Sequence, residues 1–188
     1  RPAPDQHPGA SPMPVDAHRR APSYLAGYPP ALVHQVTTLI EQGRFASALR
    51  TRYADAHAVR SDSALYDYVQ ALKATHLRSA PPLGKVRFDN TLHVIHSALG
   101  THTAISRVQG GRLQAKREIR IATLFRDVPA EFLRMITVHE LAHLRVRAHD
   151  KAFYQLCVHM EPDYHQYEFD LRAYLSYRDA GGEALWGA

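Results

Sequence analysis

Two histidines and a glutamate are the residues of this sequence whose types and spacing are best suited to chemistry. They lie in the stretch Val138-His-Glu-Leu-Ala-His143, with His139 and His143 four residues apart. On a helix, both imidazoles project from one face, one turn apart, and together can bind one Zn²⁺. Glu140 would lie beside the metal, where it can take a proton from a water molecule that the metal has made acidic. The spacing predicts His139 and His143 as metal ligands and Glu140 as the catalytic base.

The apolar residues around this group strengthen the prediction. They would place the polar side chains in a partly buried helix face, where polar groups without partners are costly and a metal is a natural partner. A chain of this composition would contain roughly 0.03–0.04 such motifs by chance. The alternative is a helix whose histidines are satisfied by ordinary hydrogen bonds. The apolar neighbours are Val138, Leu141, Ala142 and Leu144.

A catalytic zinc ion usually has three protein ligands and one open position, so a third ligand must come from beyond the helix. We favour His149, six residues after His143, which is within reach if the helix ends near residues 145–148. A glutamate from the next helix is the arrangement of one large group of zinc peptidases, so acidic residues downstream are also candidates. The alternatives are Asp150, Glu161, Asp163, His165 and Glu168.

Apolar periodicity changes along the chain and indicates how the motif is positioned. The spacing predicts short helices between residues 30 and 77, the last of them capped by Ser61 or Asp62. Short β-type runs follow at 86–88, 92–95, 104–108 and 117–125, with Gly110-Gly111 as a hairpin turn. Pro129 is well placed to start the helix that carries the motif.

We therefore expect an α+β fold, in which a small antiparallel sheet packs on a zinc-binding helix in a zincin-like arrangement, preceded by a few N-terminal helices. The chain divides into a disordered proline-rich arm at 1–23, a helical segment at 24–80 and a metallohydrolase domain at 81–188.

Composition excludes several classes of protein. The 188 residues contain a single cysteine, Cys157, which excludes a disulfide framework and a four-cysteine zinc site. No apolar run approaches eighteen residues, so we expect no membrane span. We expect a cytoplasmic protein, although a removed signal peptide would leave no trace in this sequence. Cys157 itself is expected to be a buried small hydrophobe.

The positive charge is concentrated around the motif. Between Arg107 and Arg147 there are nine basic and four acidic residues, and this excess of five equals the net charge of the whole chain. Such a region can attract an acidic peptide, a nucleotide or nucleic acid, or be no more than a solvated face. Aromatic residues are not interleaved with these basic residues, so we predict no specific nucleic-acid binding.

The stretch Val138-His-Glu-Leu-Ala-His-Leu144, followed by His149, Phe153 and Met160-Glu-Pro-Asp-Tyr164, resembles the YgjP-like family of predicted metal-dependent hydrolases, which is related to the SprT-like zinc metallopeptidases. The resemblance covers roughly residues 85–176 and implies His149 as the third ligand. It departs from the family at 107–111, where Arg-Val-Gln-Gly-Gly replaces an Arg-Trp-Gly-Ser-Cys stretch. The histidine spacing also equals that of metzincins, but Val146 stands in place of their glycine.

Three functions follow from these residues. The first is a zinc-dependent hydrolase acting on a peptide or protein, in which Glu140 takes the proton of the attacking water and passes it to the leaving amine. The second is a metal-dependent phosphohydrolase acting on a nucleotide, with arginines neutralising phosphate. The third is a non-catalytic, metal-stabilised interaction domain. Residues that could donate a hydrogen bond to a developing oxyanion are His159, Tyr164 and His165.

Overall fold

The computed structural model describes residues 24–92, 100–109 and 112–187, with only the backbone described at 100–109 and 112–116. The predicted arm at 1–23 and hairpin turn at 110–111 lie outside these residues, as does most of the predicted strand at 92–95. The elements are α1 (Pro30–Glu41), α2 (Phe45–Arg52), α3 (Asp62–His76), β1 (Leu83–Asp89), β2 (Gly100–Gln109), β3 (Arg112–Ala122), the 3₁₀ helix η1 (Thr123–Arg126), α4 (Ala130–Ala142), α5 (Lys151–Met160) and α6 (Tyr164–Asp179).

The sheet has three strands in the order β1-β3-β2 and is mixed, so the prediction of an antiparallel sheet is wrong for one of its two pairings. β2 and β3 are antiparallel, but β3 lies between β2 and β1 and runs parallel to β1. In that pairing Val86 faces Ile119 and Phe88 faces Ile121. Alternating apolar residues indicate which face of a strand is buried, and this pattern is the same for either direction of the neighbouring strand.

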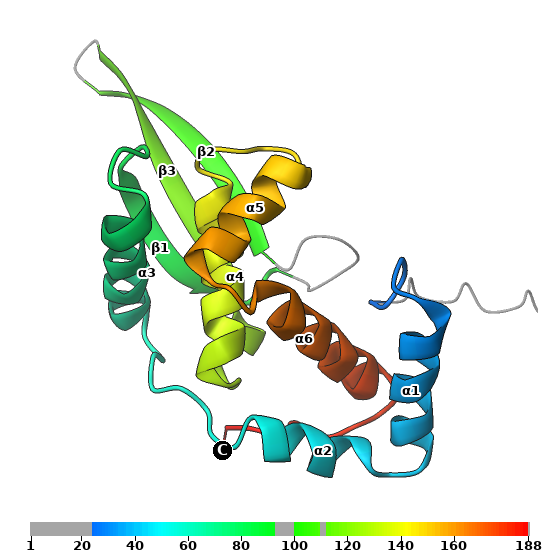
Figure 1. Ribbon diagram of the computed structural model, residues 1–188. Coiled ribbons are helices and arrows are strands. Elements are labelled where there is room, and N and C mark those ends of the chain that lie inside the picture. The colour runs from blue at the N-terminus through cyan, green and yellow to red at the C-terminus, as the bar shows by residue number, and fades with distance from the viewer. Residues whose placement is uncertain (1–23, 93–99, 110–111, 188) are drawn as a thin grey trace, which may run out of the picture.

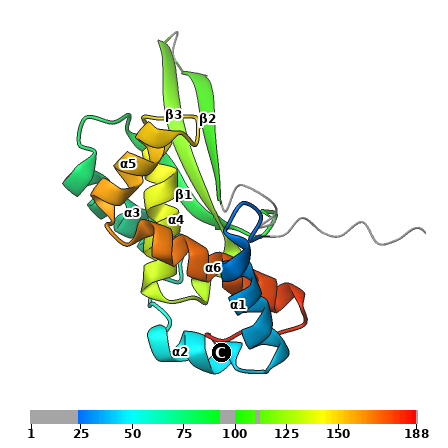
Figure 2. The same cartoon turned by 45° about the vertical axis from the view of Figure 1, so that its right-hand side comes forward.

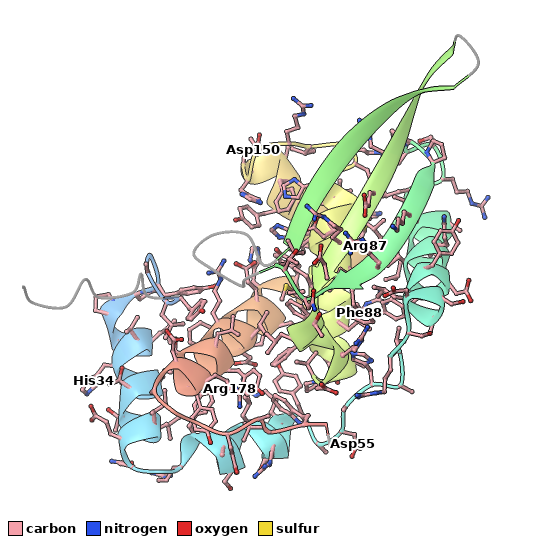
Figure 3. All side chains as sticks on the ribbon, turned by 180° about the vertical axis from the view of Figure 1, so that it is seen from behind. His34, Asp55, Arg87, Phe88, Asp150 and Arg178 are labelled. Atoms are coloured by element: carbon pink, nitrogen blue, oxygen red, sulfur yellow. The ribbon has the colours of Figure 1, made fainter. Side chains whose placement is uncertain are left out.

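Helices α3, α4 and α5 lie on one face of the sheet (Figures 1 and 2). In Figure 1 α4 and α5 lie in front of the strands, and α3 lies beside β1. From behind, in Figure 3, the strands lie in front of these helices, with Arg87 of β1 labelled. The strands β2 and β3 continue past the helices. β2 is an edge strand, because it comes last in the order β1-β3-β2. Helix α4 contacts the sheet as well as α3, α5 and α6.

Helix α4 is the central helix of the core. Pro129 is its N-cap residue and Glu131 lies in its first turn, where an acidic group favours the helix dipole. Ten of its thirteen residues are buried, including His139 and Glu140. The helix ends at Ala142, before the predicted 145–148, because the N–H of Leu144 bonds to the carbonyl of Leu141 and turns the chain away. His143 is consequently its C-cap residue.

Helices α1 and α2 lie beside α6, close to the C-terminal end of the described chain, whereas α3 packs on β1 and α4 (Figure 1). Ser61 caps α3, because its hydroxyl accepts a hydrogen bond from the N–H of Ala64 at 3.1 Å. One continuous hydrophobic core includes residues from Leu25 to Trp186. The boundary at residue 80 stays a prediction. Among the described residues, no helix combines the length and apolar character that crossing a membrane requires.

Candidate metal centre

Three histidines from the end of α4 and the loop before α5 meet at one point. His139 lies in α4, His143 caps its C-terminus, and His149 lies just before Asp150, the N-cap residue of α5 labelled in Figure 3. Their Nε2 atoms are 3.3 Å apart for His139 and His143, 2.9 Å for His143 and His149, and 3.2 Å for His139 and His149. Among the described residues, this is the group of three whose donor atoms could hold a metal ion.

Hydrogen bonds on the far side of two rings orient them toward this point. Nδ1 of His143 donates to the carbonyl of Val146 at 2.9 Å, and a carbonyl can only accept, so Nδ1 carries a proton. In a neutral ring this leaves a lone pair on Nε2. Nδ1 of His139 is 2.8 Å from the hydroxyl of Tyr164. The loop 143–149 is held at its other end by Asp150, whose carboxylate accepts from the N–H of Phe153 at 2.9 Å.

Phe153 forms an apolar wall behind all three imidazoles. Its ring centroid lies 4.9 Å from that of His139, 4.5 Å from that of His143 and 4.9 Å from that of His149. The ring is fully buried. Its contact restricts the rotation of the histidines and keeps water from one side of the group. Phe153 was quoted above only as part of the family resemblance, because the spacing of a phenylalanine on a core helix does not by itself predict a contact with metal ligands.

The electrostatics of the group fit a bound cation. Burial lowers the pKa of His139 well below its ordinary value, and the neighbouring His143 and His149 lower it further. Burial is also the main cause that lowers the pKa of His143. Neutral imidazoles with converging lone pairs repel one another unless a cation lies between them. Three nitrogens bound to one tetrahedral zinc ion at 2.0–2.1 Å would be roughly 3.3–3.4 Å apart, close to the distances found here.

Glu140 follows His139 in α4 and is fully buried. Neither carboxylate oxygen has a hydrogen-bond partner among the described residues. Burial raises the pKa of Glu140 from 4.5 to about 8. A buried carboxylate without partners is costly, and a nearby cation would favour its charged form. The unpaired carboxylate and the three converging nitrogens are therefore complementary to one metal ion.

The alternative third ligands lie outside this group. Glu161 accepts from Nε of Arg134 at 3.1 Å, and Glu168 accepts from Nε of Arg172 at the same distance. Asp150 serves as a cap, while Asp163 and His165 are exposed on or beside the first turn of α6. The structure thus brings together the three favoured histidines, whose role as metal ligands stays a prediction.

The residues considered above as hydrogen-bond donors to an oxyanion, and Cys157, differ in how close they lie to the three histidines. His159 lies against His76, with ring centroids 6.0 Å apart, and is not among the three histidines. Tyr164 is adjacent to the group, but its hydroxyl faces Nδ1 of His139 rather than the side where Nε2 points. Cys157 is a free, buried thiol whose pKa is raised by burial to about 12, so it is poorly suited to be a nucleophile.

Comparison with known proteins places these residues in a family. A family model described as YgjP-like, metallopeptidase domain, matches residues 103–174, which include α4, α5 and the three histidines. A protein of Escherichia coli (strain K12) described as UTP pyrophosphatase is 57% identical over 159 residues, or 85% of this chain and 95% of that protein. No solved structure gives a significant match. On the family model and on this identity over most of both chains, the protein belongs to the YgjP-like family.

Proposed function

We propose that this protein is a zinc-dependent hydrolase that cleaves a nucleoside triphosphate, with UTP as its substrate. The observation that carries the proposal is the convergence of three histidine Nε2 atoms beside a buried, unpaired carboxylate. The relative that is 57% identical is described as a UTP pyrophosphatase, which favours the nucleotide over the peptide as the substrate class.

His139, His143 and His149 are the residues that would hold the metal. Imidazole nitrogens suit Zn²⁺ as well as copper, iron and nickel, and three histidines with an open fourth position are a known catalytic zinc arrangement. When bound, the ion supplies Lewis acidity, which polarises a phosphoryl oxygen and lowers the pKa of water. The apolar wall formed by Phe153 and the hydrogen bonds to Nδ1 keep the ligands in place.

Glu140 is the proposed general base. Near a cation its pKa falls from the raised value of the metal-free protein, so that the carboxylate is charged and able to accept a proton from the attacking water. The oxygen of that water forms a bond to the α-phosphorus of UTP, and the bond from this phosphorus to the bridging oxygen breaks. The proton on Glu140 then passes to the leaving diphosphate, and the products are UMP and diphosphate.

Exposed basic side chains close in sequence to the three histidines support a phosphate-bearing substrate. Arg145 and Arg147 lie between the second and third histidines, Lys151 follows two residues after the third, and all three are exposed. Nη2 of Arg145 donates to Ser79 at 2.7 Å. Among the described residues, the side chains of Arg147 and Lys151 have no hydrogen-bond or ion-pair partner. We propose that these two residues contact the phosphates, whose charge they complement.

A peptidase is the second candidate, and the description of the family model as a metallopeptidase domain favours it. In a zincin-like packing of α4 on the sheet, the edge strand β2 could hold an extended peptide by strand addition. The described activity of the similar E. coli protein argues against this substrate class. Casein cleavage by the zinc-loaded protein, without UTP hydrolysis, would establish the peptidase and overturn the nucleotide proposal.

The test is UTP hydrolysis followed by phosphorus NMR, with the zinc content of the same preparation measured by atomic emission. We expect one zinc ion per chain, and UMP with diphosphate as products. Replacing His139, His143 or His149 with alanine should remove both metal and activity, whereas Glu140→Gln should keep the metal and lower kcat about 10²–10⁴-fold. His34→Ala, at an exposed histidine of α1 (Figure 3), is the matched control and should change neither.

The outcomes separate the parts of the proposal. Full metal content and wild-type turnover in Glu140→Gln would refute Glu140 as the base. A wild-type protein that binds the metal but hydrolyses nothing would favour a non-catalytic, metal-stabilised domain. A His149→Ala protein that keeps one zinc ion would exclude His149 as a ligand. Arg147→Ala should raise KM for UTP while leaving zinc content unchanged.

A further inference from the structure

One buried hydrogen bond connects the metal group to α6. The hydroxyl of Tyr164, the first residue of α6, lies 2.8 Å from Nδ1 of His139. The Tyr164 side chain is fully buried, and its ring is nearly parallel to the imidazole, at 18°. The bond is on the side of the imidazole opposite to Nε2. It therefore acts on the orientation and protonation of the ring without occupying the position of a metal ligand.

Glu168 lies behind Tyr164, one helical turn along α6. Residues four apart on a helix share a face, so Glu168 lies on the side of α6 that carries Tyr164. One of its oxygens accepts from Arg172, and the other, Oε2, is buried and has no hydrogen-bond partner among the described residues. A carboxylate on this side favours a Tyr164 hydroxyl whose proton points toward Glu168 and whose oxygen accepts from the Nδ1–H of His139.

We propose that Tyr164, supported by Glu168, is a positioning residue that keeps the proton of His139 on Nδ1 and presents Nε2 as a free metal donor. The inference deepens the proposed metal centre and rests on it. Hydrogen bonds to the second nitrogen of a histidine ligand fix its tautomer, and their loss typically costs 10–100-fold in metal affinity.

The three histidines are oriented by different groups, so a substitution at Tyr164 acts on His139 alone. His143 is oriented by a backbone carbonyl, which no substitution removes. His149 is exposed and has no such partner at Nδ1 among the described residues. His139 is the most buried of the three, at 5% exposure, and depends on a side chain. Removing that hydroxyl leaves Nδ1 buried without a partner and free to exchange its proton with Nε2.

Tyr164→Phe removes the hydroxyl and keeps the packing of the ring. Tyr174→Phe is the matched control, because Tyr174 lies on the same helix, is 1% exposed, and also uses its hydroxyl in a buried hydrogen bond, from the N–H of Leu185 at 3.4 Å. A loss of affinity that arose only from a weakened core would occur in both variants. A loss that arises from the orientation of His139 would occur only in Tyr164→Phe.

The experiment measures zinc affinity of the metal-free, full-length protein by competition with a fluorescent chelator, and the visible spectrum of the Co²⁺-loaded protein. We expect Tyr164→Phe to bind zinc about 10–100-fold more weakly and to shift the Co²⁺ bands, with Tyr174→Phe unchanged in both. Glu168→Gln should give a smaller loss of the same sign, because it removes the carboxylate on the Tyr164 side of α6 and leaves the tyrosine hydroxyl in place.

Equal affinity in Tyr164→Phe and Tyr174→Phe, or an unchanged Co²⁺ spectrum, would overturn the role of Tyr164. If Tyr164→Phe does not fold, wild-type affinity in Glu168→Gln would overturn it instead. A wild-type protein that binds no zinc would overturn the metal centre itself. Failure of the metal centre is distinguishable from failure of the role of Tyr164, because it is seen in the wild-type protein alone.

Discussion

The burial of Glu140 predicts an unusual dependence of stability on pH in the metal-free protein. Its pKa of about 8 lies above the ordinary 4.5, so between these values the folded chain holds a proton that the unfolded chain has released. Stability must then fall as pH rises, because the folded state binds more protons than the unfolded state. At about 1.4 kcal/mol for each pH unit, the total loss between pH 4.5 and pH 8 is about 5 kcal/mol.

Glu140→Gln removes this dependence while nearly keeping the shape of the side chain. The free energy of unfolding of both metal-free proteins should be measured by urea denaturation from pH 5 to pH 8.5. We expect the two proteins to be similar near pH 5, and the variant to gain on the wild type by about 1.4 kcal/mol per pH unit up to pH 8. Other groups titrate alike in both proteins, so the difference isolates Glu140.

A difference between the two proteins that stays constant over this pH range would refute the reasoning, since it would mean that Glu140 has an ordinary pKa in the folded chain. Zinc provides a second check. A cation beside the carboxylate favours its charged form. The pH dependence of the difference should therefore disappear when both proteins are saturated with zinc.

Three further predictions concern residues outside the metal group. The Cys157 thiol should remain unlabelled by Ellman's reagent in the folded protein and react after denaturation, because it is buried and its pKa is about 12; rapid labelling of the folded protein would contradict this. Asp170→Ala should destabilise the protein by about 1–3 kcal/mol in urea denaturation, because the buried hydroxyl of Tyr53 loses its acceptor, whereas the exposed Arg52 can be solvated by water; an effect below about 0.5 kcal/mol would contradict it. Trp186→Ala should cost about 3–5 kcal/mol in the same assay, since the indole packs on Phe132, and Trp186→Phe should cost less.

Local spacing was enough to predict that His139 and His143 lie together. His139 and His143 share a helix face by periodicity alone, and Glu140 follows from the same stretch. The choice of His149 over the acidic alternatives depended on where α4 ends and on whether the loop after it brings His149 back to the other two histidines. Glu161 and Glu168 are held by arginines that come from tertiary packing and from their own helix, and the sequence does not indicate which acid will be paired.

The predicted strands at 86–88 and 104–108 lie within β1 and β2, and the one predicted at 117–125 ends at Ala122, where η1 follows. The neighbours of each strand were not fully predictable. Val86 and Phe88 alternate in the same way whether β3 runs with or against β1, so the parallel pairing had no local signal. The hydrogen bond from His139 to Tyr164 also had none. It joins residues 25 positions apart, and only the packing of α6 against α4 brings them together.

The packing of the N-terminal helices on α6 has a consequence for the order of folding during synthesis. Arg172 donates to the carbonyl of Tyr24, and the indole of Trp186 donates to that of Tyr53 at 2.9 Å, across separations of 148 and 133 residues. Contacts so distant in sequence form slowly, because a long loop must close before they can stabilise anything. The ribosome must release α6 before α1 and α2 gain their partner. The histidines of α4 leave it earlier, so a nascent chain can meet a metal ion before the helix that orients His139 has been made.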